Sequence, residues 1–142
     1  MNRSLALGAL AEELEAEKLR QFHVRGFLVI DESALAVAST FHSPAFEEKL
    51  CAVGGAAMEL LKNAQRNLDL SGQSYLWLSG VERTFVAIPL LPGFVLLAIC
   101  EAGASPATAL VPLLSFAQRL VVRVFSSASS AIVSRGSMKE GA

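Results

Sequence analysis

The side chains that most often carry catalysis or bind metals are few in this sequence and lie far apart. The two histidines, His23 and His42, lack the i, i+4 spacing that puts two ligands on one face of a helix. Asp31 and Glu32 are adjacent and could bind a divalent cation, but a polar turn between two strands accounts for them without a ligand. We therefore predict no metal site and no catalytic histidine.

The cysteines and glycines offer no reactive centre either. Cys51 and Cys100 lie among apolar residues, with no CxxC spacing and no adjacent cation to lower a thiol pKa, which is typical of small core residues in a cytoplasmic protein. The Gly54-Gly55 pair lies in a helical pattern without a following Lys-Ser or Lys-Thr, so it is no phosphate-binding loop. With no nucleophile beside a base, we predict no enzymatic activity and no cofactor.

Two glycines inside a predicted helix, Gly54 and Gly55, are nevertheless the most informative feature of the chain. Each costs about 1 kcal/mol relative to alanine, so close packing must compensate. Small residues let a sheet approach the side of Gly54 and Ala57, and a second helix approach the side of Ala52, Gly55 and Ala56. A helix very close to its own sheet would account for Gly54 but not for Gly55, so the pattern favours an interface with another chain.

The predicted interface extends along this helix and onto the strand that follows it. Tyr75 and Trp77 alternate with Leu76 and Leu78, so their rings share one face of that strand. Such rings are typical of a core, and they also serve as anchors at interfaces. The residues predicted to contact a second protomer or a partner are Ala52, Gly55, Ala56, Met58, Glu59, Lys62, Asn63, Arg66, Tyr75 and Trp77.

Composition limits the function classes further. The chain has 142 residues, of which 53% are apolar and 18% charged, and its formal net charge is −1. A chain of this length can bury a core without disulfides or metals, and its near-zero charge argues against a nucleic-acid partner. The mean hydropathy of +0.48 is high for a free monomer. Either a membrane or another subunit must cover apolar surface.

The sequence favours the subunit over the membrane. The most apolar stretch, residues 84–100, is shorter than the roughly 18–20 residues of a spanning helix, and Pro89, Pro92 and Gly93 interrupt it. It is better explained as a hairpin of buried strands. The N-terminal region is rich in glutamate and has no export-type cleavage site. We expect no membrane insertion and a cytoplasmic location.

Hydrophobic periodicity predicts an α+β fold, with a five-stranded antiparallel sheet and helices on both faces. We expect residues 1–125 to form this domain and residues 126–142 to be a low-complexity mobile tail. In the first helix the glutamates, Glu17 included, are expected at the surface. The expected helices are 4–22, 43–70 and one that starts at 105–106, where Pro112 should kink it or delay its start; the expected strands are 26–31, 35–39, 74–79, 83–88 and 94–100. The residues expected to face the core from the second helix are Phe46, Leu50, Val53, Ala57, Leu60, Leu61, Ala64 and Leu68.

The order and spacing of these elements resemble the Roadblock/dynein light chain family, whose bacterial members include regulators of gliding-motility Ras-like GTPases. The turn at 31–35 departs from the family pattern because it lacks the usual glycine. The segments that carry the resemblance are 26–31 (GFLVID), 35–39, the Ala/Gly-rich helix 51–61, the strand start 70–73, and the pair 86–90 and 93–97.

This resemblance implies a Roadblock/profilin-like fold with the order α-β-β-α-β-β-β-α. It also implies a dimer, of this chain with itself or with a paralogous Roadblock-like chain, in which the second helices and third strands meet. Such dimers bind a small Ras-like GTPase, and no family catalytic residue carries over. The hypothesis is therefore a non-enzymatic scaffold that modulates the nucleotide cycle or localisation of a GTPase. The alternative is a profilin- or PAS-like domain that senses a small molecule in a pocket between sheet and helix.

Overall fold

Helices and strands follow one another in the predicted order. The computed structural model describes residues 3–70 and 72–125, and the predicted tail 126–142 lies outside them. The elements are α1 (Arg3–Arg20), β1 (Val24–Asp31), β2 (Ala36–Ser39), α2 (Pro44–Asn67), β3 (Leu76–Ser79), β4 (Arg83–Pro89), β5 (Phe94–Glu101) and α3 (Val111–Leu120), with π-helical segments at Pro106–Leu110 and Val121–Phe125.

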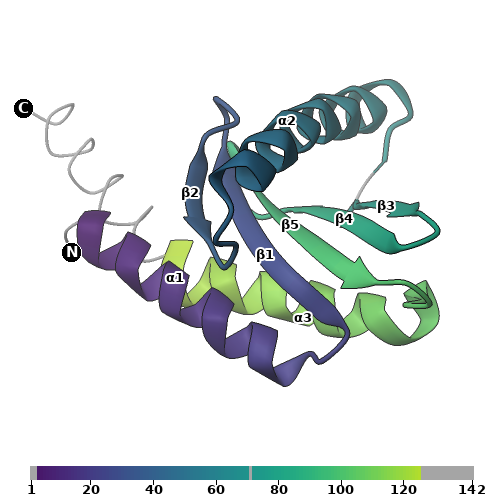
Figure 1. The fold of residues 1–142 in the computed structure, drawn as a ribbon. Coiled ribbons are helices and arrows are strands. Elements are labelled where there is room, and N and C mark those ends of the chain that lie inside the picture. Colours follow the sequence, from purple (N-terminus) through teal and green to yellow (C-terminus); the bar gives the residue numbers. More distant parts are fainter. Residues whose placement is uncertain (1–2, 71, 126–142) are drawn as a thin grey trace, which may run out of the picture.

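The strands form one antiparallel sheet in the order β2-β1-β5-β4-β3, so β2 and β3 are its edges. α2 covers one face of the sheet, and α1 and α3 lie side by side on the other (Figure 1). The predicted α+β class, with helices on both faces of a five-stranded antiparallel sheet, is confirmed. The apolar stretch at 84–100 forms the β4–β5 hairpin, as predicted.

Each face of the sheet has its own apolar core. On the face of α1 and α3, Leu14, Phe27 and Leu113 are fully buried, and the rings of Phe27 and Phe116 lie 5.0 Å apart. On the face of α2, the buried residues are Leu28, Ile30, Leu50, Ala57, Met58, Leu61, Ala87, Val95, Leu97 and Ile99. Alternate residues of the three central strands therefore enter two different cores.

The turn between β1 and β2 is held by Asp31. Its Oδ1 accepts backbone N–H bonds from Ser33 at 2.9 Å and from Leu35 at 3.1 Å. Ala34 adopts a positive φ of 60°, the conformation for which glycine is the usual residue. This finding explains how the turn forms without the glycine typical of the family, and it gives Asp31 the polar-turn role that the sequence predicted.

Capping and proline positions account for both later helices. The Ser43 side chain accepts a hydrogen bond from the N–H of Phe46 at 3.2 Å, and Pro44 occupies the first turn of α2. Pro112 falls in the first turn of α3, after the π-helical segment Pro106–Leu110. The regular α-helix thus begins later than Ser105–Pro106, which is one of the two outcomes expected of Pro112.

The face that α2 turns to the sheet differs from the prediction. Val53, Leu60 and Leu68, expected in the core, are 48%, 53% and 68% exposed. Met58 is buried on this helix instead, beside Gly54, which was expected on the side of the sheet. Val53 and Leu60 lie at one margin of the stripe formed by the buried residues of α2, and Leu68 is the C-cap residue after its last turn.

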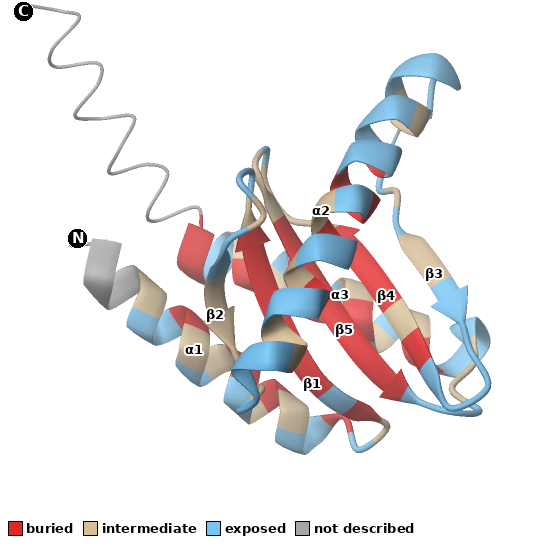
Figure 2. Ribbon diagram, turned by 45° about the horizontal axis from the view of Figure 1, so that its top comes forward, coloured by how far each residue is buried: buried red, intermediate tan, exposed pale blue. Residues whose placement is uncertain are grey.

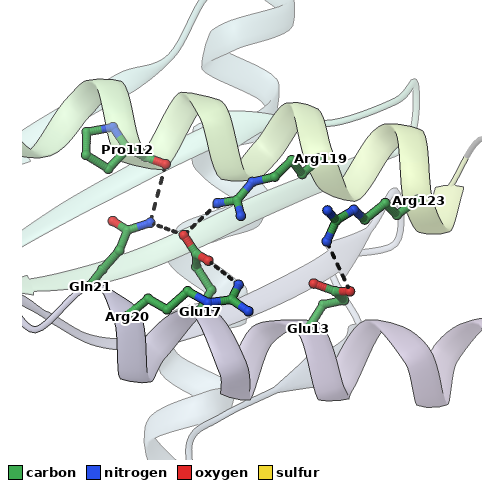
Figure 3. A network of polar contacts seen from close by, with 7 residues as sticks. All are labelled: Glu13, Glu17, Arg20, Gln21, Pro112, Arg119 and Arg123. Atoms are coloured by element: carbon green, nitrogen blue, oxygen red, sulfur yellow. Dashed lines mark hydrogen bonds and ion pairs between the residues drawn. The ribbon is translucent and has the colours of Figure 1, made fainter.

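A buried carboxylate joins α1 to the C-terminal helix (Figure 3). Glu17 is only 3% exposed, so the expectation that it lies at the surface is wrong. Arg119 Nη2 donates to Glu17 Oε2 at 2.8 Å, Gln21 Nε2 donates to the same oxygen at 2.6 Å, and Arg20 Nη1 donates to Oε1 at 3.1 Å. Burial alone would raise the pKa of Glu17, but these hydrogen bonds and the charge of Arg119 outweigh it, and the pKa is lowered.

We expect Glu17→Gln to lower the free energy of unfolding at neutral pH by about 1.5–3 kcal/mol, because three donors lose a charged acceptor. The folded-state pKa lies below the ordinary 4.5. The stabilisation from the charge is therefore complete above the unfolded-state pKa and is lost as the pH falls through the folded-state pKa. Urea titrations of both proteins at neutral pH and at several pH values below 4.5 measure the difference. A difference that does not shrink in acid would contradict this assignment.

Candidate interaction surface

The outward face of α2 is exposed along much of the helix (Figure 2). Most of its exposed residues are small or polar. Of the residues predicted at the interface, most lie on this face: Ala52, Ala56, Glu59, Lys62, Asn63 and Arg66 are exposed. Val53 and Leu60, which the prediction assigned to the core, add two large apolar side chains to it. The structure thus brings together small, charged and apolar groups along one side of a helix.

The two adjacent glycines of α2 both serve close contacts within the chain. A Cβ atom at Gly54 would clash with Leu97 Cδ1 and lie 3.0 Å from Ile30 Cδ1, so α2 approaches the sheet there, as predicted. A Cβ atom at Gly55 would lie 3.0 Å from the Cβ of Ala34 in the β1–β2 turn. The inference that only a second chain accounts for Gly55 is therefore wrong, because the turn takes that place.

Three other residues predicted at the interface do not lie on the outward face of α2. Met58 is 5% exposed and packs against the sheet, so it offers no surface to a partner. Trp77 packs against the core on the α1 and α3 face, and its Nε1 donates to Ser79 Oγ at 2.8 Å. Tyr75, 40% exposed, precedes β3. The ring of Trp77 is thus on the opposite side of the sheet from α2.

Of the two sheet edges, β3 is the more accessible for pairing. The N–H of Gly80 donates to the carbonyl of Arg83 at 2.8 Å, which closes the β3–β4 turn. In an antiparallel ladder the bonded positions alternate, so Leu78 and Leu76 pair with β4 while the backbone groups of Trp77 and Ser79 face the open edge.

The opposite edge strand, β2, is protected. The β1–β2 pairing has an irregularity between Val29 and Ile30, and α1 lies against β2. A short, irregular and partly covered edge is a common way to prevent pairing with another chain. A hydrogen bond from Gln65 to Ser74 ties α2 to the segment that leads into β3. The C-terminal part of α2 therefore lies beside the segment that leads to the open edge.

The two cysteines and the candidate metal ligands do not lie in reactive surroundings in the described part of the chain. Burial raises the pKa of the Cys100 thiol to about 11, and burial together with the charge of Glu47 raises that of Cys51. Neither thiol is activated as a nucleophile. Over residues 3–70 and 72–125, no group of three His, Cys, Asp or Glu side chains is placed to hold a metal ion.

One helical segment in the described part of the chain, Pro106–Phe125, is long and apolar enough to cross a membrane. In this fold its apolar side packs on the sheet, where Leu113, Phe116 and Leu120 are at most 1% exposed. A core helix of a water-soluble domain meets the same criterion, so the length and composition of the segment are weak evidence for a membrane span.

Comparison of the fold with solved structures identifies its type. A Roadblock/LC7 domain from Streptomyces avermitilis superposes with a TM-score of 0.68 at 11% identity, covering 78% of this chain and 92% of that domain. The chain has the Roadblock/LC7 fold. Myxococcus xanthus MglB superposes on this chain with a TM-score of 0.69 at 10% identity, covering 89% of it and 92% of MglB. An MglB with a tetrameric arrangement matches at 0.64 and 13% identity, covering 85% and 91%.

The sequence itself matches no protein-family model and no curated protein. At identities of 10–13% the structural similarity establishes the fold of this chain and leaves its activity to be argued from its own surface. The expected resemblance is thus confirmed at the level of the fold.

A matched pair of substitutions tests which glycine lies closest to the sheet. Each change from glycine to alanine in a helix gains about 1 kcal/mol in propensity, while overpacking a core costs about 1–3 kcal/mol. We expect Gly54→Ala, which meets Leu97 and Ile30, to be less stable than Gly55→Ala by at least about 1 kcal/mol. Urea titration of the two variants measures the difference. Equal stabilities, or the reverse order, would show that the helix is seated differently.

Proposed function

We propose that this chain is a non-enzymatic, cytoplasmic scaffold that forms a dimer, with itself or with a paralogous Roadblock-like chain, and binds a small Ras-like GTPase. The dimer modulates the nucleotide cycle or the localisation of that GTPase. The observation that carries the proposal is that a Roadblock/LC7 fold here has both an open β3 edge and an exposed face of α2.

The chemistry of this surface suits a second copy of the chain. Pairing of two β3 strands would satisfy the outward backbone groups of Trp77 and Ser79 and extend the sheet across the dimer. The small side chains of Ala52 and Ala56 would let two α2 helices approach closely, and Val53 and Leu60 would lose their contact with water. The tetrameric arrangement of a solved MglB supports self-association of this fold.

Two arginines near opposite ends of α2 are the candidates for contact with a GTPase. Arg66 lies in the last turn of α2, and Arg83 lies at the start of β4 with its guanidinium 5.4 Å from the centre of the Phe46 ring. The γ-phosphate of GTP orders the switch segments of Ras-like proteins. A platform that binds those segments therefore makes different contacts with the GTP-bound and GDP-bound forms. It can do so without supplying a catalytic group for GTP hydrolysis.

The proposed dimer can be tested on the outward face of α2. We expect light scattering to give about twice the mass of the 15.0 kDa chain at micromolar concentration. Ala56→Glu should weaken the dimer at least about tenfold, because two carboxylates would be buried near the symmetry axis. Ala9→Glu, an exposed position on α1, is the matched control and should leave the dimer unchanged. A chain that stays at 15.0 kDa at every concentration would exclude the homodimer, and an Ala56→Glu protein that dimerises normally would exclude this face.

For the GTPase, we expect a Ras-like protein from the same cell to bind the dimer with affinities that differ at least about tenfold between its GTP and GDP forms, equivalent to about 1.4 kcal/mol. Titration calorimetry with each nucleotide measures both affinities. Arg66→Ala and Arg83→Ala should reduce binding and any effect on hydrolysis together.

Arg123→Ala, an exposed arginine on the opposite face of the sheet, is the control and should change neither. An arginine variant that binds normally but no longer changes the hydrolysis rate would show a side chain acting in the transition state, and the non-enzymatic proposal would be wrong.

A further inference from the structure

Two hollows meet at the end of the sheet where β4 turns into β5. One, of about 330 Å³, lies between α2 and this turn and is lined chiefly by apolar side chains, among them Met58, Leu61, Leu91 and Phe94. The other, of about 530 Å³, lies between the turn and the C-terminal helix and is lined in part by Ala117, Val121 and Val122. Both are bordered by Gln65, Pro89 and Leu90. We refer to the two hollows together as the end groove.

The described part of the chain ends beside this groove. The rings of Phe125 and Phe94 lie 4.9 Å apart, and Phe94 lines the hollow under α2. Val121 and Val122, one turn before Phe125, line the other hollow, and Val122 is 69% exposed. The last described residue, Phe125, therefore contacts a side chain that lines the end groove.

The sequence that follows Phe125 has a segment suited to such a groove. Five small residues, Ser126–Ser130, precede the apolar run Ala131-Ile132-Val133. The seven residues from Phe125 to Ile132 can span at most about 25 Å when extended. A tether this short keeps a segment at an effective concentration in about the millimolar range, so even a weak contact is occupied.

We propose that Ala131-Ile132-Val133 docks in the end groove of its own chain and covers Leu91, Leu90 and the neighbouring apolar side chains. This goes beyond the proposed function, which requires neither the segment nor the groove. It gives the hollow between α2 and the sheet an occupant other than a small molecule. Removal of the segment then uncovers apolar surface at the end of the sheet.

Disulfide formation in the full chain tests the contact. With Cys51→Ser as background, Leu91→Cys is combined with Ile132→Cys, and the control pairs Ile132→Cys with Glu82→Cys, an exposed residue in the turn at the other end of β4. Cys100 is buried and stays in place. Under mild oxidation we expect the 91–132 disulfide to form at least tenfold faster than the 82–132 disulfide, in a product with the mass of one chain. Equal rates would overturn the proposal, and a covalent dimer would overturn docking within one chain.

A dye that fluoresces on apolar surfaces gives an independent readout without cysteine substitutions. Ile132→Ser combined with Val133→Ser should raise the fluorescence of bound anilinonaphthalene sulfonate severalfold, because the groove is uncovered. Met138→Ser lies beyond the apolar run and is the matched control, with no expected change. Fluorescence that stays the same in both variants would show that the segment does not cover the groove, as would a small molecule from the expressing cell found seated there.

Discussion

The burial of β5 on both faces constrains the rest of the molecule. Every residue from Val95 to Cys100 is at most 6% exposed, and these side chains alternate between the two cores. A strand of this kind needs neighbours at both edges and helices on both faces to exclude water. The arrangement of α2 against α1 and α3, with β1 and β4 on either side of β5, follows from that need. The outer edges of β2 and β3 have no neighbouring strand, and the outward face of α2 has no layer packed on it in the described part of the chain.

The same constraint explains how far sequence reasoning reaches. The alternation and turn residues of the strands predicted all five of them, and serine-proline pairs located the starts of two helices to within a few residues. The side of α2 that carries Gly54 was correctly placed against the sheet, but Val53 and Leu60 at the margin of the buried stripe were wrongly assigned to the core. Glu17 was misplaced for a different reason. Its partner Arg119 is 102 residues away in the chain, and no local pattern connects two residues so distant.

The exposure of the residues in the proposed interface was predicted in part for similar reasons. Helical spacing correctly placed Ala52, Ala56, Glu59 and Arg66 on one exposed side. Spacing alone did not reveal that Trp77 points to the opposite face of the sheet, or that Leu60 points outward. The accessible edge of β3 had no counterpart in the residue pattern, because it depends on which strand the folded chain leaves last in the sheet. Local periodicity shows which side chains of a helix or strand share a face. Which of those faces is exposed depends on how the elements assemble into the sheet and its layers.

The contact between Ala34 and Gly55 links two positions that are distant in the sequence. A left-handed alanine costs about 1–2 kcal/mol relative to a relaxed backbone, and its methyl group occupies the space beside the helix. Glycine at 34 would relieve the turn and free that space, and only then would position 55 accommodate a larger side chain without displacing the hairpin. Positions 34 and 55 are therefore expected to evolve as a pair, because the residue at each one limits the substitutions that the other tolerates. In a related sequence with glycine at position 34, a larger residue at position 55 would no longer clash with the turn.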